Sequence, residues 1–317
     1  MDLFQIISDI EKVDPEVYER FDTRRRVFKH LSGMGKAVTA AAMPAVVGTM
    51  FRKAYGQTSS LSADIVNTLN LALSLEYLEY YYYSQGVSSG LFTGNDLAAI
   101  TIIRDDELGH INLLKATLGS QAIAIPTAAA FDYTASGRIQ PFSSAALFLG
   151  TAQSFVDTGV RAYKGGAPSL MANKDILTAA LNIHSVEARH SSHIRTMRRG
   201  GIAGVGQDGG GAGDLAPKSW VSLQENGGPA PALTAPVYAG SAAASTAATK
   251  FAAEDNVSQG PSTGPINVQT TTTAPTGLTV TAAAASEAFD EPLDADSVKI
   301  IARNFRSALG ATLGLFN

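Results

Sequence analysis

The sequence contains no cysteine among its 317 residues, and this absence excludes several kinds of site. Disulfides, thiolate-bound zinc, thiolate-bound iron–sulfur clusters and cysteine nucleophiles all need the missing residue. Any bound metal ion must therefore be held by Glu, Asp or His side chains. Charged residues are also few, at 16% with a net charge of −4. Apart from one arginine run near the N-terminus, clustered basic residues are lacking, so we expect no nucleic-acid partner.

Glycine and proline are unevenly distributed along the chain. Residues 201–317 hold 15 of the 30 glycines and 8 of the 13 prolines, which is typical of loop-rich sequence. Residues 59–200 are instead periodic and compatible with helices. We therefore divide the chain into three parts: a targeting segment at 1–58, a helical domain at 59–200 and a Gly/Ala/Ser/Thr-rich extension at 201–317.

The arginine run is part of a candidate export signal. Arg24-Arg25-Arg26 is followed by Val27-Phe28-Lys29, and a weakly apolar stretch then runs over residues 31–51 with Lys36 as its one charge. This pattern resembles a twin-arginine signal, which implies a bacterial periplasmic or cell-envelope protein that meets the membrane only during export, unless the segment is retained. An ordinary amphipathic helix is one alternative. A membrane span is another, but glycines and a proline interrupt the stretch.

Four segments of the middle part have the length and hydrophobic period of helices. The second and third are separated by about 23 residues containing Pro126 and Pro141, whereas helix–helix turns usually have about 2–8 residues. Two helical hairpins joined by one long crossover are typical of an all-α, ferritin-like four-helix bundle. The expected helices cover residues 61–85, 95–119, 143–164 and 173–199.

In the extension, the sequence predicts short strands near Val237-Tyr238 and at residues 266–268. A capped amphipathic pattern predicts a terminal helix at residues 294–309.

Two Glu-x-x-His motifs carry the candidate chemistry. Glu107 and His110 lie on the second expected helix, and Glu187 and His190 lie on the fourth. Positions i and i+3 share a helix face, so each helix can direct one carboxylate and one imidazole at a common point. One such motif means little, but two of them on paired hairpins predict a metal site.

The two motifs are also related by an internal repeat of 80 residues. The same offset maps Glu76 of the first helix onto Val156 of the third, and Tyr83 onto Tyr163. Di-iron carboxylate bundles use one Glu from each of two helices and a Glu-x-x-His motif from each of the other two. This sequence therefore supplies five of those six ligands and has valine in the sixth position.

Three side chains are candidates to replace the missing carboxylate. Glu79 shares a face with Glu76, and its repeat partner is Gly159, which leaves space for a side chain to cross the core. Asp157 is turned about 100° from position 156, and Gln153 faces correctly but is a neutral, weaker ligand. We rank Glu79 above Asp157 and Asp157 above Gln153. Tyr83 and its repeat partner Tyr163 are further candidates for contact with the site.

Residues 60–200 resemble the ferritin-like family that includes the desiccation-related proteins. The resemblance rests on four strings: Leu-Glu-Tyr-Leu-Glu from Leu75, Asp-Asp-Glu-Leu-Gly-His from Asp105, Gly-Val-Arg-Ala-Tyr-Lys-Gly from Gly159 and Val-Glu-Ala-Arg-His from Val186. It implies that the metal ligands are Glu76, Glu107, His110, Glu187 and His190. Val156 departs from the family pattern, which leaves open a di-iron centre, a single ion or no metal.

Two classes of function follow. One is a metal-binding envelope protein that holds iron or manganese and acts as an oxidase or in stress protection, because Glu and His suit those ions. The other is a metal-free structural or interaction protein, in which Arg104 and Arg189 balance the carboxylates. A second copy of the chain or another envelope protein is the expected partner in either case.

Overall fold

In the computed structural model of this chain, the residues described are 61–201, 217–260, 263–271 and 279–317. The targeting segment predicted at residues 1–58 lies outside these ranges. None of the helices in the described part of the chain combines the length and hydrophobicity that a membrane-spanning helix needs.

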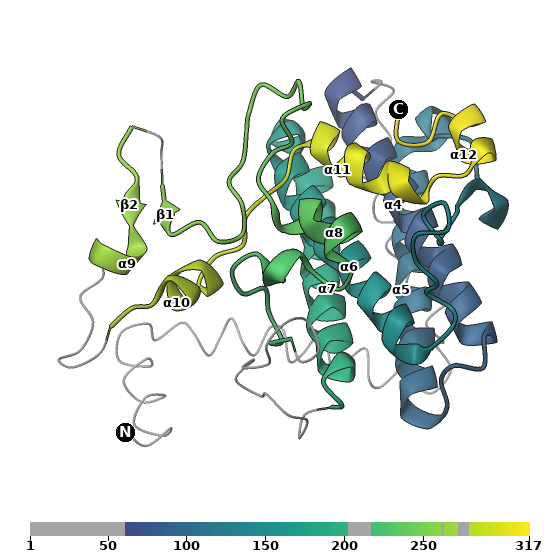
Figure 1. Cartoon of the computed structure of the whole chain (residues 1–317). Coiled ribbons are helices and arrows are strands. Elements are labelled where there is room, and N and C mark those ends of the chain that lie inside the picture. Colours follow the sequence, from purple (N-terminus) through teal and green to yellow (C-terminus); the bar gives the residue numbers. More distant parts are fainter. Residues whose placement is uncertain (1–60, 202–216, 261–262, 272–278) are drawn as a thin grey trace, which may run out of the picture. The chain divides into compact units, whose positions relative to one another are not determined.

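Four long helices form the bundle. The side chains of Ser62, Ser144 and Asn173 cap three of them by accepting hydrogen bonds from backbone N–H groups of the first turn. The first helix packs on the second and the third on the fourth, and the first and third also contact each other (Figure 1). The predicted bundle of two helical hairpins is therefore confirmed. The helices are α4 (Ala63–Ser88), α5 (Gly94–Leu118), α6 (Ala145–Leu170) and α7 (Lys174–Arg198).

Helix α6 continues past Gly165 and Gly166, where the sequence predicts its end. A Cβ atom on Gly165 would lie 1.9 Å from the backbone oxygen of Leu293, and one on Gly166 would lie 2.8 Å from Thr68 Cγ2. The two glycines therefore allow close contact with the C-terminal extension and with α4. Their role is packing inside a helix, which a local sequence pattern does not distinguish from termination.

The long crossover between α5 and α6 is fixed by side chains of α4. Asn70 donates a hydrogen bond to the Gln121 backbone oxygen and accepts one from the Ile123 N–H, each at 2.8 Å. Tyr81 donates to the Pro126 oxygen at 2.9 Å. The crossover contains two short 3₁₀ turns, η2 (Gly119–Gln121) and η3 (Ala128–Ala130).

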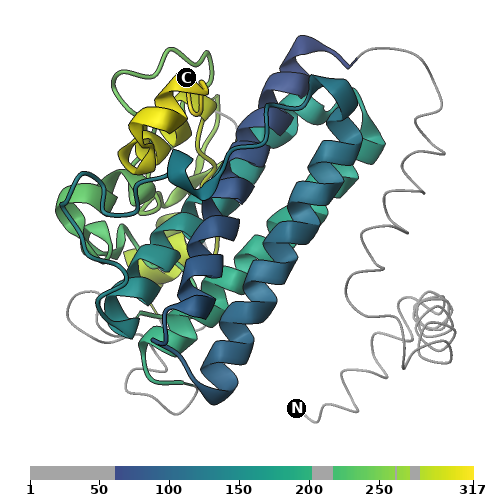
Figure 2. The ribbon, with the colours of Figure 1, turned by 90° about the vertical axis from the view of Figure 1, so that its right-hand side faces the viewer.

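The C-terminal extension consists of short elements on one side of the bundle (Figure 2). Two of them reach its long helices: the helix at Pro231–Tyr238 contacts α6, and the helix at Ala295–Ala302 contacts α4 and α6. Its two strands pair antiparallel, with Ser258 opposite Asn267. The elements are η4 (Glu225–Gly227), α8 (Pro231–Tyr238), β1 (Ser258–Gln259), β2 (Ile266–Asn267), α9 (Val268–Thr271), α10 (Ala282–Glu287), α11 (Ala295–Ala302), η5 (Arg303–Phe305) and α12 (Ala308–Thr312).

Two expectations for the extension differ from the structure. Val237 and Tyr238, predicted as strand, end helix α8, which has a proline in its first turn where a missing N–H costs nothing. The helix predicted at residues 294–309 is divided at Arg306, which forms a β-bridge with Phe131 of the crossover. The division is a tertiary effect, because the backbone there pairs with another segment.

Arg161 of α6 attaches the extension to the bundle from a buried position. Its Nε lies 2.8 Å from Glu254 Oε1 and donates to the Glu291 backbone oxygen at 2.9 Å. Another of its N–H groups donates to the Ala239 oxygen at 2.8 Å. Three separate stretches of loop are thus fixed by one side chain.

Candidate metal centre

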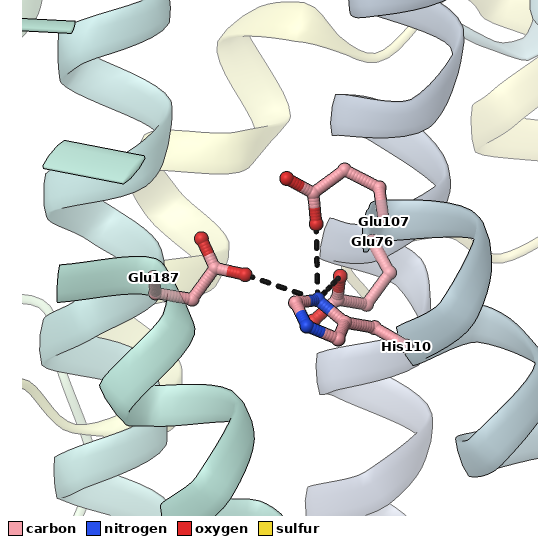
Figure 3. Close-up of side chains that lie close together, drawn as sticks. All are labelled: Glu76, Glu107, His110 and Glu187. Carbon is pink, nitrogen blue, oxygen red and sulfur yellow. Dashed lines mark hydrogen bonds and ion pairs between the residues drawn. The ribbon is translucent and has the colours of Figure 1, made fainter. Parts of the chain in front are cut away.

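Three helices direct one imidazole and three carboxylates to a single point inside the bundle. The four potential ligand atoms all lie within 4.8 Å of one another, and none of these residues is more than 8% exposed. Figure 3 shows the carboxylates arranged around the imidazole. The residues are Glu76 from α4, Glu107 and His110 from α5, and Glu187 from α7.

The imidazole nitrogen of this cluster faces more acceptors than it has protons. His110 Nδ1 lies 3.0 Å from Glu76 Oε2, 3.1 Å from Glu107 Oε2 and 3.2 Å from Glu187 Oε1. A ring nitrogen carries at most one proton, so one N–H cannot satisfy three carboxylate oxygens. These separations are close to the roughly 3 Å between neighbouring ligand atoms around an ion with metal–ligand bonds of about 2.1 Å.

His190, the histidine of the second motif, lies on the other side of Glu107 and Glu187 from His110. His190 Nδ1 is 3.1 Å from Glu107 Oε1 and 3.6 Å from Glu187 Oε2, and the two imidazole rings are 6.2 Å apart. Glu107 and Glu187 therefore each turn one oxygen toward His110 and the other toward His190. Both carboxylates are placed to bridge two positions.

Two further residues orient these groups. Tyr163 of α6 donates a short hydrogen bond to Glu76 Oε1. Asp106 accepts a hydrogen bond of 3.1 Å from His190 Nε2, which leaves Nδ1 of that ring directed at the carboxylates. A carboxylate on the far nitrogen of a ligating histidine fixes the ring and increases its basicity.

Asp106 was not expected from the sequence. Its position next to Glu107 places it about 100° away around α5, so the Glu-x-x-His spacing does not include it. The run Asp105-Asp106-Glu107 is the one local signal, and it does not show which of the two aspartates faces α7.

Glu79 is the candidate replacement that enters the site. It is 4% exposed, and its Oε1 lies 3.5 Å from where a Cβ on Gly159 would be, with Glu187 Oε2 3.6 Å from the same point. Val156 is fully buried and brings no polar atom. Tyr83 is also fully buried, and no hydrogen-bond partner for its hydroxyl occurs among the described residues.

Asp157 and Gln153 are directed away from the cluster into a separate polar network. Asp157 accepts hydrogen bonds from Ser191 Oγ at 2.6 Å, Arg195 Nη2 at 2.5 Å and Tyr238 Oη at 2.8 Å. Gln153 donates to the Tyr238 hydroxyl at 3.0 Å. Both side chains are thus used in attaching α6 to α7 and α8.

The arginines considered as counter-charges do not serve that purpose in this structure. Arg104 pairs with Asp105 at 2.6 Å on the outside of α5, and Arg189 is exposed.

Burial and proximity shift the pKa values of the cluster in opposite directions. Burial raises the pKa of Glu76 to about 8, with His110 partly offsetting this effect. Burial, followed by repulsion from Glu187 and Glu107, raises the pKa of Glu79 well above its usual range. Burial also acts to raise the pKa of Glu107, but His190 and His110 hold this pKa below the usual range.

The two imidazoles show the complementary effect. Burial acts to lower the pKa of His110 and of His190, but attraction to Glu76 and Glu107 respectively raises each pKa well above the usual value. Without a cation, protons therefore occupy the cluster at neutral pH, and they compensate charge that a metal ion would otherwise balance.

The unpaired polar atoms fit a bound cation. Among the described residues, several buried atoms of the cluster have no hydrogen-bond partner, although some lie within ion-pair distance of each other. An unpaired buried polar atom costs about 1–3 kcal/mol, and bound metal would satisfy the five unpaired atoms of this cluster. They are Glu79 Oε2, Glu107 Oε1, Glu187 Oε1, Glu187 Oε2 and His190 Nδ1.

Comparison with protein families confirms the predicted ferritin-like fold of the bundle. Residues 64–199 match the family described as the ferritin-like domain, and the match spans all four bundle helices and both Glu-x-x-His motifs. No curated protein and no solved structure matches the chain.

Proposed function

We propose, from the premise that residues 64–199 form a ferritin-like domain, that this chain binds iron or manganese in the bundle core. The observation that carries the proposal is the single nitrogen of His110 within 3.2 Å of three carboxylate oxygens. Oxygen-rich sites with one or two imidazoles suit both ions. The residues that hold the ion are Glu76, Glu107, His110 and Glu187.

An ion of this kind supplies one-electron redox and Lewis-acid chemistry when bound. The protein residues bind and orient it: Glu107 and Glu187 each present both oxygens, and Tyr163 holds Glu76 in place by its hydrogen bond. Asp106 keeps the proton of His190 on Nε2, so that Nδ1 is free to donate its lone pair. The surrounding apolar side chains exclude water from the cluster.

We propose oxidase or stress-protective activity for this site, as in the desiccation-related type of ferritin-like protein that the sequence resembles. Supporting this, the cluster combines redox-compatible ligands with two buried tyrosines, Tyr83 and Tyr163.

A metal-free scaffold is the alternative function, and one observation favours it. The raised pKa values of Glu76, His110 and His190 support it, because protons on these groups would compensate the carboxylates without a cation. In that case the bundle would serve to carry the extension attached through Arg161.

Metal analysis of the full chain separates these two functions. The protein is stripped with a chelator, reloaded with Mn²⁺ or Fe²⁺ and measured for bound metal and thermal unfolding. We expect at least one ion per chain and a higher Tm in the loaded protein, because the ion binds only the folded state. Less than about a tenth of an ion per chain, with unchanged melting, would leave the scaffold function standing.

Two variants and a matched control sharpen this test. Glu107→Gln and His110→Ala should each lose metal and the metal-dependent rise in Tm together. Asp105→Asn, on the same helix but paired with Arg104 at the surface, should keep both. Unchanged metal content in all three variants would point to nonspecific binding.

We also propose that residues 1–58 direct export of the folded, metal-loaded chain to the periplasm or cell envelope. The support is the Arg24-Arg25-Arg26 run and the weakly apolar stretch after it. Replacing the three arginines with lysine should retain the chain in the cytoplasm of a bacterial host, as measured by cell fractionation. Unchanged export would contradict this proposal.

We further propose that the chain has a partner, either a second copy of itself or another envelope protein. Light scattering of the exported protein tests for the homo-oligomer, and a pull-down experiment tests for the envelope partner.

A further inference from the structure

Glu79 lies one turn beyond Glu76 on α4, and its carboxyl group is buried without visible compensation. The residue is 4% exposed, and Oε2 has no hydrogen-bond partner among the described residues. Its neighbours in the core include Glu107 and Glu187, whose charges act against its ionisation. An ionised carboxylate in this position is costly unless it meets a cation.

Helix α6, on the other side of the core from Glu79, leaves space for this side chain. Val156, which occupies the place of a third-helix carboxylate, is apolar and fully buried. One turn later, Gly159 has no side chain, and the oxygens of Glu79 and Glu187 lie 3.5 Å and 3.6 Å from where its Cβ would be. A larger residue at 159 would fill the space that the two carboxylates use.

Atoms of His190, Glu107 and Glu187 form a second donor set beside the first. His190 Nδ1 lies 3.1 Å from Glu107 Oε1 and 3.6 Å from Glu187 Oε2, and none of these three atoms makes a hydrogen bond with a described residue. The first donor set uses the other oxygen of each glutamate together with His110. One carboxylate is still needed to complete the second set, and Asp157 and Gln153 are both engaged elsewhere.

We propose that Glu79 completes a second cation position, shared with Glu107, Glu187 and His190, so that a carboxylate from the first helix replaces the one missing from the third. This inference rests on the proposed metal-binding function. Charge supports it: the four buried glutamates carry −4 when ionised, which two divalent cations neutralise, whereas one cation would leave −2 inside the bundle.

Manganese stoichiometry measured by equilibrium dialysis tests the assignment on the full chain. The wild-type protein should bind about two Mn²⁺ ions, and Glu79→Gln, which keeps the shape of the side chain, should bind about one. The EPR spectrum should change from that of a spin-coupled pair to the six-line signal of an isolated ion. Circular dichroism establishes that the variant is folded.

A second variant tests position rather than charge. Val156→Glu combined with Glu79→Gln returns a carboxylate to the third helix and should restore the second ion and the coupled spectrum. Two ions in Glu79→Gln, or one ion in both wild type and Glu79→Gln, would overturn the role of Glu79 while the metal-binding function stands. No ion in the wild-type protein would overturn the metal-binding function itself.

Discussion

The variant Asp157→Asn tests whether Asp157 stabilises the fold or binds the metal ion. Asp157 and Arg195 form an ion pair of 2.5 Å with side-chain exposures of 2% and 0%, and breaking one partner of a buried pair costs about 3–5 kcal/mol. Ser191 and Tyr238 donate to different oxygens of Asp157, of which asparagine keeps one as an acceptor, and Arg195 keeps Glu225 at 3.1 Å. We therefore expect the lower end, a loss of about 3 kcal/mol in the free energy of unfolding.

Urea unfolding of the chelator-treated protein, followed by circular dichroism, measures this loss. A loss of that size also corresponds to a fall of about 6–12 °C in Tm for a domain of this size. Metal content after reloading should equal that of the wild-type protein, because Asp157 faces away from the cluster. Glu225→Gln, which removes the longer of the two Arg195 ion pairs, is the matched control and should cost less. If Asp157→Asn lost metal while the stability of the apo protein stayed unchanged, the structural role of Asp157 would be refuted and Asp157 would be a metal ligand.

Three other predictions follow from the site and its supports. Asp106→Asn should weaken metal binding about 10–100-fold, because His190 loses its orienting carboxylate; titration calorimetry measures this, and an equal loss in Asp105→Asn would argue against it. The apo protein should lose stability as the pH rises from 5 to 8. Folding raises the pKa of Glu76 to about 8 and also raises the pKa values of His110 and His190, so the folded protein holds protons that the unfolded chain releases. Metal binding needs those ligands deprotonated, so the Tm difference between loaded and apo protein should widen as pH rises, and a constant difference would contradict this. Gly165→Val should destabilise the protein by about 1–3 kcal/mol through overpacking against the Leu293 backbone, as measured by urea unfolding, whereas an unchanged stability would show that the extension moves freely.

The sequence predicts the bundle and the positions of the main donors because both depend on regular helix geometry. Glu107 and His110 must share a face of α5, and the 80-residue repeat relates Glu76 to a position across the core. The same repeat relates Glu79 to Gly159, so the sequence alone indicates both the missing carboxylate and its proposed replacement. These inferences need the helical period and little else.

The remaining features depend on contacts between segments that are distant in the chain. Asp106 meets His190 because of how α5 and α7 pack, which spacing within α5 does not indicate. Gly165 and Gly166 resemble a helix stop, yet they admit Leu293 and Thr68. Val237 and Tyr238 have the residue types of a strand but belong to a helix begun by a proline. Local preference is overridden in each case by tertiary packing.

A crystal of the full chain soaked with Mn²⁺ and examined by anomalous scattering tests the central claim most directly. The metal-binding account predicts an anomalous peak at coordination distance, about 2.0–2.3 Å, from His110 Nδ1 and from carboxylate oxygens of Glu107 and Glu187. A fully ordered bundle without a peak among these atoms at saturating Mn²⁺, or with peaks only on its outer surface, would contradict it.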